Sequence, residues 1–158
     1  MMPERRNGLL RGVVLSGMLW GAHSVAAEVP QLNLQLVQGV RAGLIADGTR
    51  LMRGRLAIQA PHDGFRVWME AMTSGSQSNR YVLTGRQHSG HILHVRLERE
   101  GWQSDGPGGK GIALLTSEAT AEFDMVADGD QQVAADSYGF DLLAATDIPV
   151  SDIKDRMP

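Results

Sequence analysis

The sequence predicts an all-β fold, and more specifically an incomplete immunoglobulin-like β-sandwich that lacks its last strand. Seven segments alternate apolar and polar side chains with a period of two, which is the pattern of a strand with one buried face. Turn residues separate these segments, and helical spacing is weak outside the N-terminal leader. Many short strands at near-regular spacing are typical of antiparallel sandwiches and barrels.

Four of the seven strands are predicted in the first half of the chain. Residues 31–37 (QLNLQLV) place alternate leucines on one face, and residues 65–71 alternate three apolar side chains with Arg66, Trp68 and Glu70. Gly54 lies inside the second strand and predicts a β-bulge. The four strands are residues 31–37, 50–59, 65–71 and 80–84.

Three more strands are predicted in the second half, at residues 92–97, 120–127 and 137–143. Residues 101–111 (GWQSDGPGGKG) are too rich in glycine for a regular element, and Asp128-Gly129-Asp130 is expected to form a turn. After Leu143 no clean strand follows, because Pro149 interrupts the remaining apolar residues and cannot donate to a sheet ladder. The sheet therefore stops one strand short, unless the tail 147–158 closes it.

Two aromatic residues favour the immunoglobulin version of the sandwich. Trp68 lies on the third predicted strand, where such domains bury a tryptophan, and Tyr138 begins the last strand, as in a tyrosine corner. The alternative is that both are ordinary core residues of another β-sandwich.

The first 27 residues have the layout of a secretory signal peptide: a basic start, an apolar run from Gly12 to Gly21, and small residues at Val25-Ala26-Ala27. Cleavage after Ala27 would leave residues 28–158 as one domain. Without Arg5, Arg6, Arg11 and Glu4, the 15 basic and 18 acidic side chains become 12 and 17, a net charge of −5. An acidic surface argues against nucleic acid as a partner, because affinity for nucleic acid comes mainly from neutralising phosphates. The chain has no cysteine, which excludes disulfide bonds and thiolate chemistry.

No constellation of residues predicts catalysis, a metal or another cofactor. His91 and His94 are three apart, so on one strand they would point to opposite faces, and His88 adds no complete ligand set. His62 lies in a Pro-His-Asp-Gly turn. Residues 106–111 (GPGGKG) lack the first glycine and the Ser or Thr of a phosphate-binding loop. We expect a protein that is not an enzyme, although a hydrolase using His62 or the three histidines is kept as a minor alternative.

Six segments resemble the AfaD/DraD-type invasins, in the same order along the chain. These invasins are minor tip subunits of chaperone–usher fimbriae, with relatives in the Saf and Agg systems. The chain departs from the best-known members in lacking their cysteine pair. The segments are residues 62–69 (HDGFRVWM), 80–82 (RYV), 101–102 (GW), 108–111 (GGKG), 123–129 (FDMVADG) and 138–140 (YGF).

The resemblance implies a fimbrial tip subunit that takes part in host-cell adhesion and invasion, with its sandwich completed by donor-strand complementation. The implied partners are a periplasmic chaperone, an outer-membrane usher, a major pilin subunit that donates the strand, and a host-cell receptor. The subunit would cross the periplasm and end in the fimbrium. Few residues separate Ala27 from the Leu32 strand, so this subunit would accept a strand without donating one, which suits a tip.

The donor strand would pair with the first and last strands, and their apolar faces would line its groove. The main alternative is a self-contained periplasmic or secreted β-sandwich binding protein, in which the same residues are ordinary core. The receptor-binding surface is not identified, although exposed Arg66, Arg86, Arg99 and Trp102 are candidates because arginine and aromatic residues dominate interfaces. The candidate groove residues are Leu32, Leu34, Leu36, Tyr138, Phe140 and Leu142.

Overall fold

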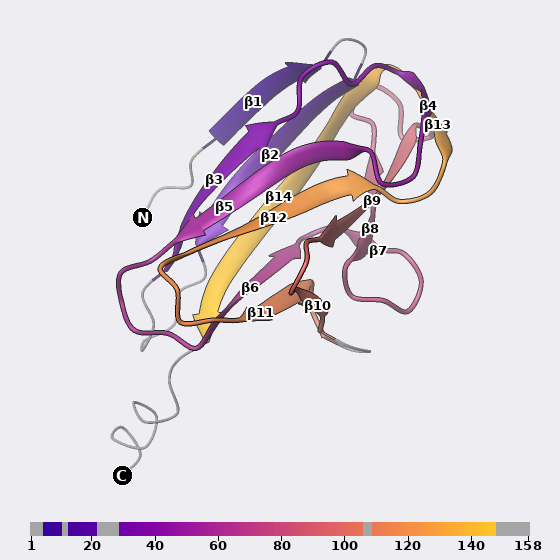
Figure 1. Ribbon diagram of the computed structural model, residues 1–158. Helices are drawn as coiled ribbons and strands as arrows, with labels where there is room; N and C mark the ends of the chain where they lie inside the picture. The colour runs from indigo at the N-terminus through magenta and orange to yellow at the C-terminus, as the bar shows by residue number, and fades with distance from the viewer. Residues whose placement is uncertain (1–4, 11–12, 22–28, 106–108, 148–158) are drawn as a thin grey trace.

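Strand pairing divides the chain into two six-stranded sheets and one two-stranded ribbon (Figure 1). The computed structural model describes residues 5–10, 13–21, 29–105 and 109–147. All regular elements in these ranges are strands. No helix in the described ranges is long and apolar enough to cross a membrane. The all-β sandwich predicted from the sequence is therefore confirmed.

The first sheet is built around β14, the long strand drawn in yellow in Figure 1. Its order is β1-β2-β14-β6-β11-β10, and β14 pairs with β2 on one side and with β6 on the other. The strands are β1 Arg5–Leu10, β2 Val13–Gly21, β14 Asp136–Asp147, β6 Gly64–Met69, β11 Ile112–Leu115 and β10 Gln103–Ser104.

The second sheet has the order β3-β5-β12-β9-β8-β7, and all its pairs are antiparallel. A short ribbon of two further strands, β4 and β13, lies beside it. The strands of the sheet are β3 Gln31–Leu36, β5 Arg50–Ala57, β12 Thr120–Ala127, β9 Ile92–Glu98, β8 Arg80–Thr84 and β7 Met72–Thr73. The ribbon consists of β4 Gly43–Ile45 and β13 Gln131–Val133.

The hydrophobic core lies between the inner faces of the two sheets. It contains every second residue of the central strands, as the period of two requires. Burying one such large side chain stabilises the fold by about 1.5–3 kcal/mol. The largest fully buried side chains are Tyr81, Tyr138, Phe65, Phe123, Leu51, Met52, Leu56, Leu83, Leu93, Leu97 and Ile112.

All seven predicted strands are present; β8 and β12 have the predicted ends, and no end of the others differs by more than four residues. The largest difference is at β14, which runs on to Asp147 because residues 142–147 pair with β6. The other seven of the fourteen strands were not predicted: β1 and β2 lie in the expected signal peptide, and β4, β7, β10, β11 and β13 have two to four residues each. The alternative in which the tail 147–158 closes the sheet falls, beyond Asp147, outside the described residues.

The expectation that Trp68 is a core residue is wrong. Phe65, Val67 and Met69 fill the inner face of β6, so the alternation turns Trp68 to the outer face, where it is half-buried. Tyr138 is fully buried, and its hydroxyl group donates a hydrogen bond of 2.7 Å to the backbone oxygen of Ala134, four residues upstream. That bond is the one a tyrosine corner makes.

The expectation of a bulge at Gly54 is also wrong. The irregularity in this strand pair lies between Met125 and Val126, whereas Gly54 pairs directly with Phe123. The Phe123 ring occupies the space where a side chain at position 54 would begin. Glycine is needed here for the close approach of a neighbouring ring.

We expect Gly54→Ala to destabilise the fold by about 1–3 kcal/mol, because the added methyl group would overlap the Phe123 ring and overpack the core. Urea unfolding followed by circular dichroism measures the loss. Phe123→Leu shortens the opposing side chain, so the double variant should be more stable than the sum of the single losses predicts. Simple additivity would contradict the proposed overlap.

Candidate functional site

β3 and β14 are the first and last of the seven strands predicted from the sequence, and the pairing of their edges decides whether a further strand can be added. β3 pairs with β5 on one side, and no other described strand pairs with its second side. β14 pairs with β6 through residues 142–147. Its opposite side is a second row of backbone donors and acceptors that also needs a partner.

In the full chain, β2 occupies this second side of β14. Val13–Gly21 pairs in parallel with Asp136–Ala144, and β2 also contacts β3 (Figure 1). Gly17 lies opposite Phe140, and a Cβ atom at position 17 would come within 2.6 Å of the Phe140 ring. The position beside β14 therefore holds the apolar segment of the predicted leader. Its capacity for strand formation could be read from VVLSGMLWG, although the sequence analysis assigned this run to a signal peptide.

The structure brings the six candidate groove residues into one hydrophobic core. Leu32, Leu34, Tyr138, Phe140 and Leu142 are buried, and Leu36 is half-buried and packs against them. They come from β3 in one sheet and β14 in the other, so they bridge the two layers at this end of the sandwich. A strand added beside β14 would meet this apolar lining.

The start of β14 is fastened to the loop that follows β8. Asp136 is buried and accepts hydrogen bonds from the backbone N–H groups of Gln87, His88 and Ser137 at 2.9, 3.1 and 2.6 Å. His91 Nδ1 lies 2.9 Å from Asp136 Oδ2. No local pattern in the sequence singles out Asp136, because three of its partners, Gln87, His88 and His91, are more than forty residues away in the chain.

These contacts lower the pKa of Asp136. Burial raises the pKa of this carboxyl group, but the hydrogen bonds from Gln87, His91, Ser137 and His88 together outweigh burial and bring the pKa to about 2. Asp136 is therefore an ionised anchor that holds the first residues of β14 in place.

The histidines singled out in the sequence do not converge on a metal. The rings of His88 and His91 are stacked with centroids 4.9 Å apart, and His91 contacts Asp136. Both ring nitrogens of buried His62 face backbone oxygens, those of Ala60 and Glu118. Within the described part of the chain, no three histidine, aspartate or glutamate side chains are grouped to hold a metal ion.

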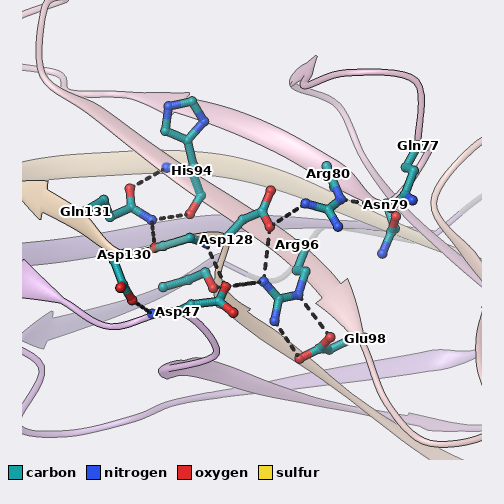
Figure 2. A network of polar contacts seen from close by, with 12 residues as sticks. Asp47, Gln77, Asn79, Arg80, His94, Arg96, Glu98, Asp128, Asp130 and Gln131 are labelled. Atoms are coloured by element: carbon teal, nitrogen blue, oxygen red, sulfur yellow. Dashed lines mark hydrogen bonds and ion pairs between the residues drawn. The ribbon is translucent and has the colours of Figure 1, made fainter.

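A polar network covers the outer face of the second sheet (Figure 2). Arg80 and Arg96 are direct neighbours across β8 and β9, which would repel each other. Asp128 Oδ1 lies 2.9 Å from Arg80 Nη1 and 3.0 Å from Arg96 Nη1, so one carboxylate serves both. Arg96 also binds Glu98 and Asp47, at 3.0 and 2.6 Å.

The hydrogen bond with Glu98, followed by those with Asp47 and Asp128, raises the pKa of Arg96 in spite of its partial burial. The network ties the loop before β5 and the turn after β12 to the centre of the sheet. The charges of this network are paired with one another, so we assign it a structural role.

Comparisons with known proteins agree with this geometry. Residues 41–144 match the family model described as Enterobacteria AfaD invasin protein. The chain is 32% identical over 146 residues to Protein AfaD of Escherichia coli, covering 90% of this chain and 98% of that protein. Among solved structures, the Salmonella SafD adhesin is 37% identical with a TM-score of 0.72, over 75% of this chain and 84% of SafD. HdaB, the minor tip subunit of the Escherichia coli Hda pilus, also has a TM-score of 0.72, with 28% identity over 77% of this chain and 85% of HdaB.

We expect the ionised Asp136 anchor to make stability depend on pH in acid. Because the folded pKa of about 2 lies below the unfolded value of 3.8, the anchor stabilises the fold fully above about pH 4 and loses its effect as the pH falls towards 2. Asp136→Asn should therefore lower the urea midpoint at pH 6, and the gap to the unchanged protein should narrow at pH 3. A gap that stays constant from pH 6 to pH 3 would contradict this role.

Proposed function

The chain belongs to the AfaD invasin family, and from this premise we propose that the edge of β14 accepts a donor strand from a neighbouring pilin. As a member of this family it is a minor tip subunit and adhesin of a chaperone–usher fimbria at the cell surface. Its family is one of adhesins and invasins and not of enzymes. It assembles with other components of a pilus.

One observation carries the proposal: the only strand beside Asp136–Ala144 on that side, among the described residues, comes from the predicted leader. Removal of residues 1–27 during export would take β2 away. The second side of β14 would then lose its ladder, and the apolar residues beneath it would lose their cover. Each buried backbone group left without a partner costs about 1–3 kcal/mol.

A strand from another molecule can satisfy both needs. Its backbone would pair with β14, while alternate side chains would enter the apolar space between β3 and β14. Phe140, buried opposite Gly17 in the full chain, marks the position where the donor needs a small residue. In this scheme a periplasmic chaperone covers the edge first, the outer-membrane usher receives the complex, and the major pilin then supplies the lasting strand. The finished tip contacts a receptor on the host cell.

A second candidate function is a self-contained exported binding protein. The pairing of β2 with β14 favours it, because the full chain completes its own sheet when residues 13–21 stay attached. The two functions differ in whether residues 1–27, which include β2, are cleaved from the chain during export.

We expect export to remove residues 1–27. The full chain, expressed in a bacterial host with a secretion pathway, should give a periplasmic protein whose intact mass corresponds to Glu28–Pro158. A variant with Ala27→Pro next to the expected cleavage point should remain uncleaved and serves as the control. Recovery of the unchanged protein with residues 13–21 attached would favour the self-contained alternative.

We also expect the 28–158 form to melt at a lower temperature than the full chain and to be stabilised by an added strand. The probe is a soluble peptide carrying residues 13–21 (VVLSGMLWG) between lysines. A second probe is the N-terminal segment of the major pilin of the same fimbria. A peptide present at 100 times its dissociation constant should add about 2.7 kcal/mol.

The control is the same peptide with aspartate at alternate apolar positions, which should have no effect. The acceptor proposal is contradicted if the 28–158 form is monomeric and as stable as the full chain, and if no peptide raises its melting temperature.

A further inference from the structure

The outer face of the second sheet, beside the paired network of Figure 2, carries arginines that share one carboxylate. Arg50 Nε and Arg53 Nε lie 3.3 and 3.2 Å from the same oxygen, Asp124 Oδ1, and Arg99 Nη1 lies 3.2 Å from Asp124 Oδ2. The side chain of Asp124 is only 8% exposed, so the three guanidinium groups cover it. One carboxylate cannot balance three guanidinium charges.

The three arginines differ in how far they are neutralised. Arg99 has a second partner, because its Nη2 lies 3.2 Å from Glu122 Oε2. Arg50 and Arg53 contact Asp124 through Nε, and within the described part of the chain no acceptor is bound to their Nη groups. These side chains are 48% and 35% exposed. They therefore present charged donors to solvent.

These donors line a hollow of about 600 Å³. Its walls include Arg50, Arg53, Arg99 and Trp102, and Asp124 and Glu100 also line it. This volume lies within the range of small-molecule sites, which is about 300–1,000 Å³. A second hollow of about 410 Å³ shares Arg99, Glu100 and Trp102 with the first. The two hollows thus flank Trp102.

Trp102 is held in a defined orientation. Gly101 has a φ of 89°, which only glycine adopts readily, and this turn lets the Trp102 N–H donate to the Arg99 oxygen at 3.0 Å. The indole Nε1–H donates a hydrogen bond of 2.8 Å to the backbone oxygen of Glu122. The indole ring lies edge-on to the Phe123 ring, with the ring centroids 6.0 Å apart. A fixed aromatic side chain between two hollows is a preorganised platform for a ligand.

The charges around the first hollow are of both signs, which argues against a polyanion. Glu98 also lines it, but its carboxylate is held by Arg96 at 3.0 Å. Glu100 remains as an acceptor at the rim next to Trp102. A ligand that fits this set carries one anionic group for the Nη donors, hydroxyl groups for the carboxylates, and a ring face for the indole. A sugar acid has all three.

We propose that the hollow formed by Arg50, Arg53, Arg99 and Trp102 binds a carboxylate-bearing sugar of a host glycan. The sugar carboxylate accepts hydrogen bonds from the Nη groups of Arg50 and Arg53, in the bidentate geometry that guanidinium groups favour. The sugar ring lies against Trp102, and its chain continues into the second hollow. This ligand would make the hollow a receptor site of the tip subunit, on the sheet that does not contain β14.

The test is a titration of the isotope-labelled full chain by NMR with three sugars. 3′-Sialyllactose and a hyaluronan tetrasaccharide carry carboxylates from two different sources, a sialic acid and a uronic acid, and lactose is the neutral control. We expect at least one acidic sugar to shift the indole N–H signal of Trp102 in a saturable way, while the signal of Trp68 stays in place. The acidic sugar with the lower dissociation constant shows whether the site prefers a sialic acid or a uronic acid.

Arg50→Gln/Arg53→Gln should weaken this binding by about tenfold or more, since it removes the charge-assisted donors. Arg41→Gln removes a charge from an exposed position that lines neither hollow and should bind as the unchanged chain does. The proposal is overturned if no acidic sugar at about 10 mM, which would fill about 90% of a site with a dissociation constant of about 1 mM, shifts the Trp102 signal. It is also overturned if lactose shifts this signal equally, or if the folded double variant binds the acidic sugar as tightly as the unchanged chain. If the double variant does not fold, the Trp102 signal of the unchanged chain still tests whether an acidic sugar binds at the hollow. The titration needs no pilin, so its failure would leave the strand-acceptor function untouched.

Discussion

The constraint on which this structure depends is that both sides of β14 need a hydrogen-bonded neighbour. One side is served by β6 and, near its start, by the loop that follows β8. The other side is served by β2, a segment that the sequence assigns to a removable leader. Backbone donors and acceptors cannot be left unpaired beside an apolar core without a large cost in free energy. If β2 is removed on export, as we propose, this cost favours binding of a strand from another subunit.

The two proposed sites, one for a donor strand and one for a sugar, lie in separate regions of the molecule. The proposed strand-acceptor edge lies between β3 and β14, and its lining belongs to the common core. The arginine hollow lies on the outer face of the second sheet, above β5, β9 and β12. Glu98 also lines this hollow, but its carboxylate is paired with Arg96 at 3.0 Å. In the proposed function, a donor strand would enter one region while the other stays exposed to a host surface.

Much of the fold could be predicted because a strand with one buried face has a period that is visible locally. The alternation placed all six candidate groove residues on inward faces, and the same alternation explains why Trp68 points outward. The short strands β4, β10 and β13 could not be predicted, since two or three residues show no period. β11 directly follows a glycine-rich segment and has only four residues, so its sequence does not indicate a strand. It forms a strand because it pairs with β6.

The sequence by itself determined the fold class, the inward and outward faces of each main strand, and the relationship to fimbrial tip subunits. These properties depend on the order of apolar and polar residues and on short motifs, which are read within a few positions. Only the tertiary structure decided which segment lies beside β14, that Asp136 anchors its start, and that Arg50, Arg53 and Arg99 meet at Asp124. The physical reason is that backbone hydrogen bonding is nearly independent of side-chain identity, and charge pairs between distant strands follow the register of the sheet.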